Sequence, residues 1–205
     1  MNILTMDETS PWRKFCADIG SDIDRGPWIA GGAARRLYQN EGGGADFTTG
    51  DIDIFFPTSG HEAAKGRVIN ALAKMRQGYS KPASYKKTST DEFFIGGRAT
   101  RVQMIGQPCE DLTALFRSFD FTVSQFAASG QFLAFTDAAR DDLVEMKLDL
   151  AVPVQPRKWT TPMRLTKYCF YGFTPAPGVL RWAAGLDQNK VDSDMRIVDE
   201  AKHGY

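Results

Sequence analysis

Two stretches, WIAGGAARRLY (residues 28–38) and DIDIFF (residues 51–56), decide the fold of this chain. In the first, a short apolar strand runs into Gly31 and Gly32, and the residues that follow (33–39) have helical periodicity. In the second, polar and apolar residues alternate before the stretch becomes apolar, which is typical of a strand. Together they predict a strand–turn–helix unit that is followed by a second strand.

The rest of the chain predicts a mixture of helices and strands. Helical spacing of apolar residues indicates helices over 11–24, 61–77, 109–117, 138–147, 163–171 and 179–186, with a weaker pattern over 192–202. Three short strands are expected within 83–105, and residues 119–127 and 132–136 form a predicted hairpin around a serine–glycine turn. This order of elements predicts an α/β (α+β) fold, with a mixed central sheet flanked by helices.

A cluster of prolines divides the chain. Pro153, Pro156 and Pro162 lie close together, which is typical of a linker. We therefore expect a main domain over residues 1–152 and a short helical C-terminal extension over residues 153–205 that packs on it.

The charge balance argues against one broad class of partner. The 205 residues include 25 basic and 25 acidic side chains, so the formal net charge is zero. A protein whose whole surface grips nucleic acid carries an excess of positive charge, so only a local basic patch is left open. No apolar run approaches the ~18 residues of a membrane helix, and the first ten residues lack a signal-peptide pattern, so we expect no membrane partner.

The cysteines are typical of a cytoplasmic protein. Cys16, Cys109 and Cys169 are odd in number and lack CxxC spacing, so they suggest neither a disulfide framework nor a zinc site. We expect three reduced thiols, with Cys169 buried among its apolar and aromatic neighbours.

Asp51 and Asp53 are the candidate metal ligands. Residues i and i+2 of a strand point to the same face, ~6.5–7 Å apart along the chain, so two such carboxylates can share divalent cations. Hard oxygen ligands suit Mg²⁺, with Mn²⁺ as a possible substitute, and Mg²⁺ also takes water and phosphate oxygens. An Asp-x-Asp pattern alone is weak, because it also occurs by chance and in calcium loops.

The preceding turn is a candidate phosphate site. Gly31 and Gly32 let a phosphate approach the backbone closely, and the amides at the start of the following helix favour an anion. Arg35, one turn into that helix, can add a charged clamp on a triphosphate. Most Gly-Gly pairs are simple turns, so it is the order of the turn and the Asp pair that makes the combination specific.

This combination resembles a known superfamily. Residues 28–38 are similar to the GG-x-V-R-D segment of class II CCA-adding enzymes and bacterial poly(A) polymerases, nucleotidyltransferases of the DNA polymerase β-like superfamily. Gly31, Gly32 and Arg35 match that segment, and residues 51–54 (DIDI) match the DID sequence that follows it. The resemblance implies a nucleotidyltransferase fold for the main domain.

Two later segments extend the resemblance over about residues 26–173, with gaps. Residues 120–123 (DFTV) resemble a DFT-(I/V)-NA-L-A segment, and residues 164–173 (RLTKYCFYGF) resemble the basic–aromatic helix that ends this kind of catalytic head. A similar run also occurs in uncharacterised nucleotidyltransferase-like proteins of viral and microbial genomes.

The chain departs from the family pattern at several positions. Arg36 stands where the family has Asp, Ser118-Phe119 stands where it has Arg-Arg, and Ser124 replaces an Asn. The base-selecting body and tail domains of the CCA-adding enzymes are not recognisable in these residues. CCA addition itself is therefore not implied.

Asp120 is the candidate third carboxylate. Sites of this superfamily often add an acidic residue from a neighbouring strand, and we expect Asp120 to lie in the strand over residues 119–127. The alternative is that Asp120 contacts the nucleotide or is structural, with Gln103 of the preceding strand at the place of the acid.

A basic–aromatic helix face supplies further candidates. Arg164, Lys167 and Tyr168 are spaced i, i+3 and i+4, so they share one face. They can clamp a triphosphate and stack on a base. Alternatively, this helix only covers the sheet, with its charges in water.

The resemblance implies a metal-dependent enzyme that transfers a nucleoside monophosphate (NMP) from a nucleoside triphosphate (NTP) such as ATP to an acceptor hydroxyl. The family motifs favour an RNA or tRNA end as acceptor. The neutral charge favours a protein or small-molecule acceptor, as in AMP transfer to a side chain. The altered motifs also leave open a catalytically silent binding module.

Overall fold

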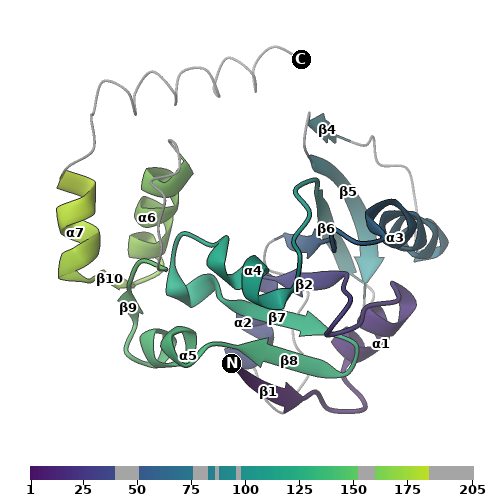
Figure 1. Cartoon of the computed structure of the whole chain (residues 1–205), viewed down its shortest axis with the longest axis horizontal. Helices are drawn as coiled ribbons and strands as arrows, with labels where there is room; N and C mark the ends of the chain where they lie inside the picture. The colour runs from purple at the N-terminus through teal and green to yellow at the C-terminus, as the bar shows by residue number, and fades with distance from the viewer. Residues whose placement is uncertain (40–50, 76–82, 86–87, 96–97, 152–159, 185–205) are drawn as a thin grey trace.

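An eight-stranded mixed sheet forms the centre of the molecule in this computed structural model (Figure 1). The structure describes residues 1–39, 51–75, 83–85, 88–95, 98–151 and 160–184. The strands of the sheet lie in the order β1-β8-β7-β2-β3-β6-β5-β4. Their bounds are β1 Asn2–Thr5, β2 Trp28–Ala30, β3 Ile52–Phe55, β4 Ala83–Tyr85, β5 Thr88–Ile95, β6 Arg98–Ile105, β7 Phe126–Ser129 and β8 Phe132–Phe135.

Helices flank this sheet, as the sequence predicts. They are α1 Pro11–Asp18, α2 Gly32–Gln39, α3 His61–Met75, α4 Leu112–Arg117, the short 3₁₀ helix η1 Thr122–Ser124, α5 Asp137–Val144, α6 Thr160–Phe170 and α7 Pro177–Ala184. A separate parallel pair, β9 (Lys147–Leu148) and β10 (Thr174–Pro175), connects the region after α5 to the chain between α6 and α7. The predicted α/β class is confirmed.

The pairing of β3 makes the sheet mixed. This strand runs antiparallel to β2 on one side and parallel to β6 on the other, whereas the other neighbouring strands are antiparallel. In this register Asp53 lies opposite Ala30 of β2 and opposite Gln103 of β6. β3 therefore places Asp53 between the turn after β2 and the side chains of β6.

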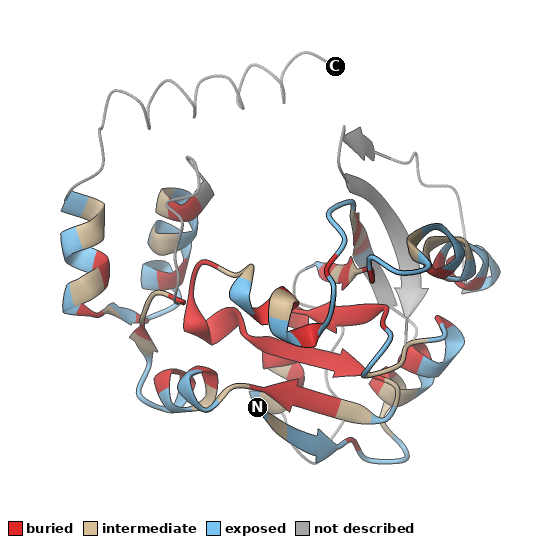
Figure 2. Ribbon diagram, in the orientation of Figure 1, coloured by how far each residue is buried: buried red, intermediate tan, exposed pale blue. Residues whose placement is uncertain are grey.

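The two faces of the sheet are covered by different helices. Ile29 and Ile54 point to one face and join a core that contains Trp12 of α1 and Val68 of α3. The other face carries a second cluster, in which Trp28 and Ala30 pack against Leu115 and Phe116 of α4. The central strands are accordingly buried, while the outer sides of α5 and α7 are exposed (Figure 2). Because Asp53 lies opposite Ala30 in the register, it emerges on the α4 face.

Most predicted elements are present, with shifts of a few residues at their ends. Among the helices the largest shift is in α1, which ends at Asp18 and not at residue 24. Gly20 takes a left-handed conformation there (φ 66°), and the Ser21 amide donates to the Cys16 carbonyl at 2.9 Å, which is a common helix stop. β1 was not predicted, because this edge strand is largely exposed and its residues do not alternate.

The predicted strand over residues 119–127 is wrong in its first half, so Asp120 does not lie in a strand of the sheet. The backbone of this segment bonds elsewhere: the Thr122 amide donates to the Asp149 carbonyl at 3.0 Å, and the Ala151 amide donates to the Asp120 carbonyl at 2.9 Å. The Thr122 hydroxyl also donates to the buried carboxylate of Asp142. These local bonds turn the chain into η1, and the strand begins only at Phe126.

Several expectations concern other parts of the chain. The helical pattern over 192–202 and most of the proline-marked boundary between 1–152 and 153–205 lie outside the described residues. The three cysteines are free, and Cys169 is exposed, so the prediction of its burial is wrong. Among the described helices, none has the length and apolar character needed to cross a membrane.

Candidate active site

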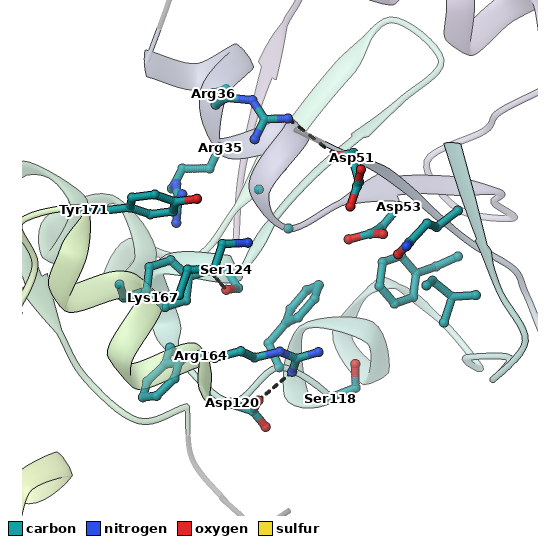
Figure 3. Close-up of a pocket in the computed structure, with 18 of the residues that line it drawn as sticks. Arg35, Arg36, Asp51, Asp53, Ser118, Asp120, Ser124, Arg164, Lys167 and Tyr171 are labelled. Atoms are coloured by element: carbon teal, nitrogen blue, oxygen red, sulfur yellow. Dashed lines mark hydrogen bonds and ion pairs between the residues drawn. The ribbon is translucent and has the colours of Figure 1, made fainter. Parts of the chain in front are cut away.

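One cavity of about 710 Å³ collects the candidate residues (Figure 3). Its walls come from the turn after β2, from α2, β3 and β6, from the segment after α4, and from α6. All nine residues singled out in the sequence line it: Gly31, Gly32, Arg35, Asp51, Asp53, Asp120, Arg164, Lys167 and Tyr168. Segments more than 130 residues apart in the chain therefore meet at one place.

The carboxylate pair is the acidic wall of this cavity. Asp51 is exposed, while Asp53 is half-buried and its Oδ1 atom is shielded from solvent with no hydrogen-bond partner. Burial raises the pKa of Asp53 to about 6, and the neighbouring charge of Asp51 adds to the rise. A shielded carboxylate oxygen without a partner is a high-energy arrangement that a cation would relieve.

The turn after β2 has the backbone conformation that a close approach requires. Gly31 is left-handed (φ 76°), which strains any residue with a side chain. Its carbonyl accepts the bond from the Arg35 amide at 3.0 Å that closes the first turn of α2. The first amides of α2, which have no acceptor within the helix, therefore lie at the cavity wall beside Gly31 and Gly32.

Arg35 is buried between two aromatic rings. Its side chain is 7% exposed, and its guanidinium lies 5.1 Å from the ring centre of Tyr168 and 5.5 Å from that of Phe173. The Nε and Nη1 atoms have no hydrogen-bond partner. A buried guanidinium with unused donors beside a cavity is suited to an anionic ligand.

Arg36 adds a second, half-buried charge at the same wall. One Nη atom approaches the carbonyl of Asp51 at 3.5 Å, while Nε is shielded and has no partner. Burial, followed by the charge of Arg35, lowers the pKa of Arg36, while Asp53 and Asp51 act in the opposite direction. The residue that departs from the family motif thus sits between the glycine turn and the carboxylates.

Helix α6 supplies the cations on the opposite side. Arg164 and Lys167 point from this helix into the cavity and face the wall that bears Asp51 and Asp53 (Figure 3). Both are close enough to lower the pKa of Asp53, against the effect of burial. The ring of Tyr168 anchors α6 against Phe121 and Phe173, and its hydroxyl shares a 2.7 Å hydrogen bond with Ser124.

Asp120 is separated from the carboxylate pair. It is 5% exposed and forms an ion pair with Arg164 on the far side of the cavity (Figure 3). No group of three acidic, histidine or cysteine side chains in the described ranges could hold one metal ion. The arrangement therefore favours the alternative for Asp120, a residue that orients Arg164, and leaves Asp51 and Asp53 as the candidate ligands.

The structure also changes the reading of the aromatic residues. Tyr168, expected to stack on a base, is 8% exposed and packs against Phe121, Phe173 and Arg35, so its ring supports the site from behind. Tyr171, which the sequence analysis did not single out, is 54% exposed and lines the cavity. It lies one helical turn after Tyr168, so the spacing could have identified it.

Four uncharged residues that were not assigned a nucleotide role complete the cavity beyond Asp53. They are Phe55, Gln103, Ile105 and Phe119. Phe55 shares the face of Asp53 because it is two residues further along β3, and Gln103 and Ile105 share that face on β6. The alternation could have predicted Phe55, whereas Phe119 reaches the cavity only because residues 120–122 turn away from the sheet.

Comparison with solved structures shows what this fold is similar to. Two chains, titled tRNA-processing enzyme in apo form I and apo form 2, align with TM-scores of 0.53 and 0.50 at 15% and 16% sequence identity. Each alignment covers 83% of this chain, but only 44% and 46% of the respective solved chain. This chain thus spans less than half the length of the structures it matches, and at such identity the likeness concerns the fold alone.

The sequence itself identifies a family. No curated protein matches the chain. A family model described as Gad2, Gabija anti-defense 2 family protein, matches residues 8–144, which include β2, α2, β3 and the segment that bears Asp120. The match extends over more than half of the chain, and the protein therefore belongs to the Gabija anti-defense 2 family.

Proposed function

We propose that this protein is a nucleotidyltransferase that uses a divalent cation to transfer NMP from an NTP to an acceptor hydroxyl. The observation that carries the proposal is that carboxylates and cations line different walls of one cavity. Asp51 and Asp53 line one wall, and cations from α2 and α6 line the other walls. A nucleoside triphosphate is a ligand with both matching parts: a polyanion for the cations, and phosphate oxygens that can share a metal with the carboxylates.

The carboxylates fit Mg²⁺, with Mn²⁺ as a possible substitute. Mg²⁺ usually takes one or two protein carboxylates, several waters and the substrate phosphates, so Asp51 and Asp53 suffice without a third acid. The unpartnered Oδ1 of Asp53 supplies an oxygen with no competing hydrogen bond. When bound, the cation would neutralise phosphate charge and polarise the reacting phosphorus centre.

The residues of the chain would bind and orient the triphosphate. The amides that follow Gly31 and the unused donors of Arg35 would hold its phosphates, and Arg36 would add charge beside them. Arg164, oriented by the buried Asp120, and Lys167 would close the anion site from α6. Positioning and electrostatic stabilisation are the main contributions that such a reaction needs.

The acceptor hydroxyl and the biological role are part of the proposal. The solved neighbours are titled tRNA-processing enzymes, which supports an RNA end as acceptor. The family is named for anti-defense against Gabija, and we propose that NMP transfer serves that role. A protein acceptor is the second candidate, supported by the uncharged side of the cavity beyond Asp53.

A transfer assay with α-labelled NTPs tests this function. The protein is incubated with each labelled NTP and total macromolecules from a cell lysate, in Mg²⁺ or in excess EDTA, and incorporated label is measured. We expect Mg²⁺-dependent incorporation that falls at least ~100-fold in the Asp51→Ala plus Asp53→Ala double variant.

The control is Asp18→Ala plus Asp24→Ala, which removes two exposed carboxylates outside the cavity and should leave transfer unchanged. Transfer that survives the Asp51 and Asp53 substitutions would show that the site is misassigned. Absence of both NTP binding and transfer in the unaltered protein would refute the proposed function.

A further inference from the structure

The sheet order separates a charged side and an uncharged side of the carboxylate pair. β3 lies between β2 and β6, so the glycine turn and α2 are on one side of Asp53, and β6 is on the other. The cations of the described cavity wall come from α2 and α6 alone. Gln103 and Ile105 line the β6 side, Phe55 of β3 lies beside them, and none of these three residues carries a charge.

Phe55 and Phe119 form an aromatic wall. The rings of Phe55 and Phe119 meet edge to face, with centres 5.7 Å apart and planes at 80°. Both side chains are half-buried, so part of each ring remains open to the cavity. Phe119 also lies next to Gly31, where an added Cβ would be 3.7 Å from its ring, so the wall borders the phosphate-binding turn. An aromatic wall of this kind accepts another ring in an offset or edge-to-face contact.

The geometry of in-line displacement indicates that the acceptor approaches from the β6 side. If the proposed function holds, the leaving pyrophosphate lies against the cations of α2 and α6. The attacking oxygen must then approach the phosphorus from the opposite direction, because the attacking and leaving oxygens are in line. The opposite direction is the β6 side, where the Phe55 end of the aromatic wall lies beside Gln103 and Ile105.

We propose that the acceptor is the hydroxyl of a tyrosine in a partner protein. The aromatic wall would pack against the tyrosine ring, and the amide of Gln103, opposite Asp53 in the sheet, can both donate to and accept from the peptide backbone of the partner. A phenol has an ordinary pKa of about 10, far below that of an aliphatic hydroxyl, so it gives up its proton more readily.

The uncharged β6 side is unfavourable for an RNA acceptor. An RNA end brings one phosphate per nucleotide close to the attacking hydroxyl, and proteins hold such phosphates mainly with lysine and arginine. Among the described residues that line the β6 side, there is neither.

The transfer balances without a further reactant. The tyrosine oxygen attacks the α-phosphorus of the NTP, and a bond forms between them. The bond between the α-phosphorus and the bridging oxygen to the β-phosphorus breaks, and pyrophosphate leaves with the electron pair. The phenolic proton passes to water, and the product is a tyrosine O-linked NMP.

The test compares two acceptor pools from cells that carry a Gabija system. One pool is protein freed of RNA with ribonuclease, and the other is RNA freed of protein. Each is incubated with the 205-residue protein, Mg²⁺ and α-labelled NTPs, and labelled sites are identified by mass spectrometry. We expect label on tyrosine in the protein pool. If the protein pool carries at least ~10-fold less label than the RNA pool, the proposal is wrong.

Variants connect the label to the aromatic wall. Phe119→Leu and Phe55→Leu should each lower tyrosine labelling about tenfold, with NTP affinity within about twofold of the unaltered protein. Phe170→Leu is the matched control, because Phe170 is 85% exposed and outside the cavity, and it should have no effect. Thermal unfolding of each variant identifies any that fails to fold. If one aromatic variant does not fold, the labelling by the other tests the role of the wall.

The outcomes separate this inference from the function on which it rests. Label at RNA 3′ ends, or on serine or threonine, would overturn the tyrosine acceptor while NMP transfer stands. Tyrosine labelling that is insensitive to both aromatic variants would overturn the role of the wall. Label in neither pool would refute the proposed function together with the inference.

Discussion

Asp53→Asn should make the ligand-free protein more stable at neutral pH while it abolishes the proposed activity. Burial and the charge of Asp51 raise the pKa of Asp53 from 3.8 to about 6. A rise of about two units corresponds to about 3 kcal/mol of unfolding free energy lost when the carboxyl ionises in the folded protein. An asparagine of the same shape avoids that cost.

The pH dependence follows from the sign of the shift. At low pH, below about 4, Asp53 is protonated in the folded and the unfolded chain, so the substitution changes little. As pH rises through about 6, the unaltered protein loses stability and the variant does not. At pH ~7.5 the variant should therefore gain up to ~3 kcal/mol, or about 6–12 °C in melting temperature for a chain of this size.

The assay is denaturant unfolding at about pH 4, 5, 6 and 7.5, with EDTA present so that no divalent cation stabilises Asp53. Asp51→Asn is the matched control, because it removes the neighbouring charge from an exposed position and should gain less. A variant no more stable than the parent at neutral pH would refute the argument. A gain in unfolding free energy that is equal at pH ~4 and ~7.5 would also refute the argument, because such a gain could not come from the ionisation of Asp53.

Three further substitutions test other parts of the cavity. Arg35→Met should weaken NTP binding about 10–100-fold, as expected when charge-assisted bonds to phosphate are lost, and an unchanged affinity in titration calorimetry would exclude that role. Tyr168→Phe removes the buried hydrogen bond to Ser124 and should cost about 1–3 kcal/mol in denaturant unfolding, while NTP affinity stays within about twofold. Gly31→Ala and Gly60→Ala both place a side chain at positive φ and should each cost about 1–2 kcal/mol, but only the change at Gly31 should weaken NTP binding.

The sequence predicts the parts of the fold that rest on local patterns. The turn at Gly31-Gly32 and the alternation that begins at Asp51 indicate a strand–turn–helix and a strand, and both are present. The periodicity of apolar residues predicts the flanking helices, because each must bury one face. The mixed sheet follows from these elements, but the parallel pairing of β3 with β6 is set by contacts distant in sequence.

The errors lie where distant groups decide the backbone. Residues 119–127 have the composition of a strand, yet the side chain of Thr122 finds the carboxylate of Asp142, and the backbone pairs with residues 149–151. No pattern within the segment contains that information. The same turn moves Asp120 away from the sheet and brings Phe119 into the cavity, so one unpredicted bend changes both the candidate metal site and the proposed acceptor side.

The strand order also determines when the protein can first act during its synthesis. β2 is made about a hundred residues before its partner β7, and β1 is likewise made long before its partner β8 at residues 132–135. The cations of α6 are translated later still. At about 5–20 residues per second, the nascent chain exposes its carboxylate strand for several seconds before the cavity can close. Ribosome-bound chains that end before α6 should therefore neither bind nucleotide nor resist proteolysis at β3, and both properties should appear only after α6 has been made.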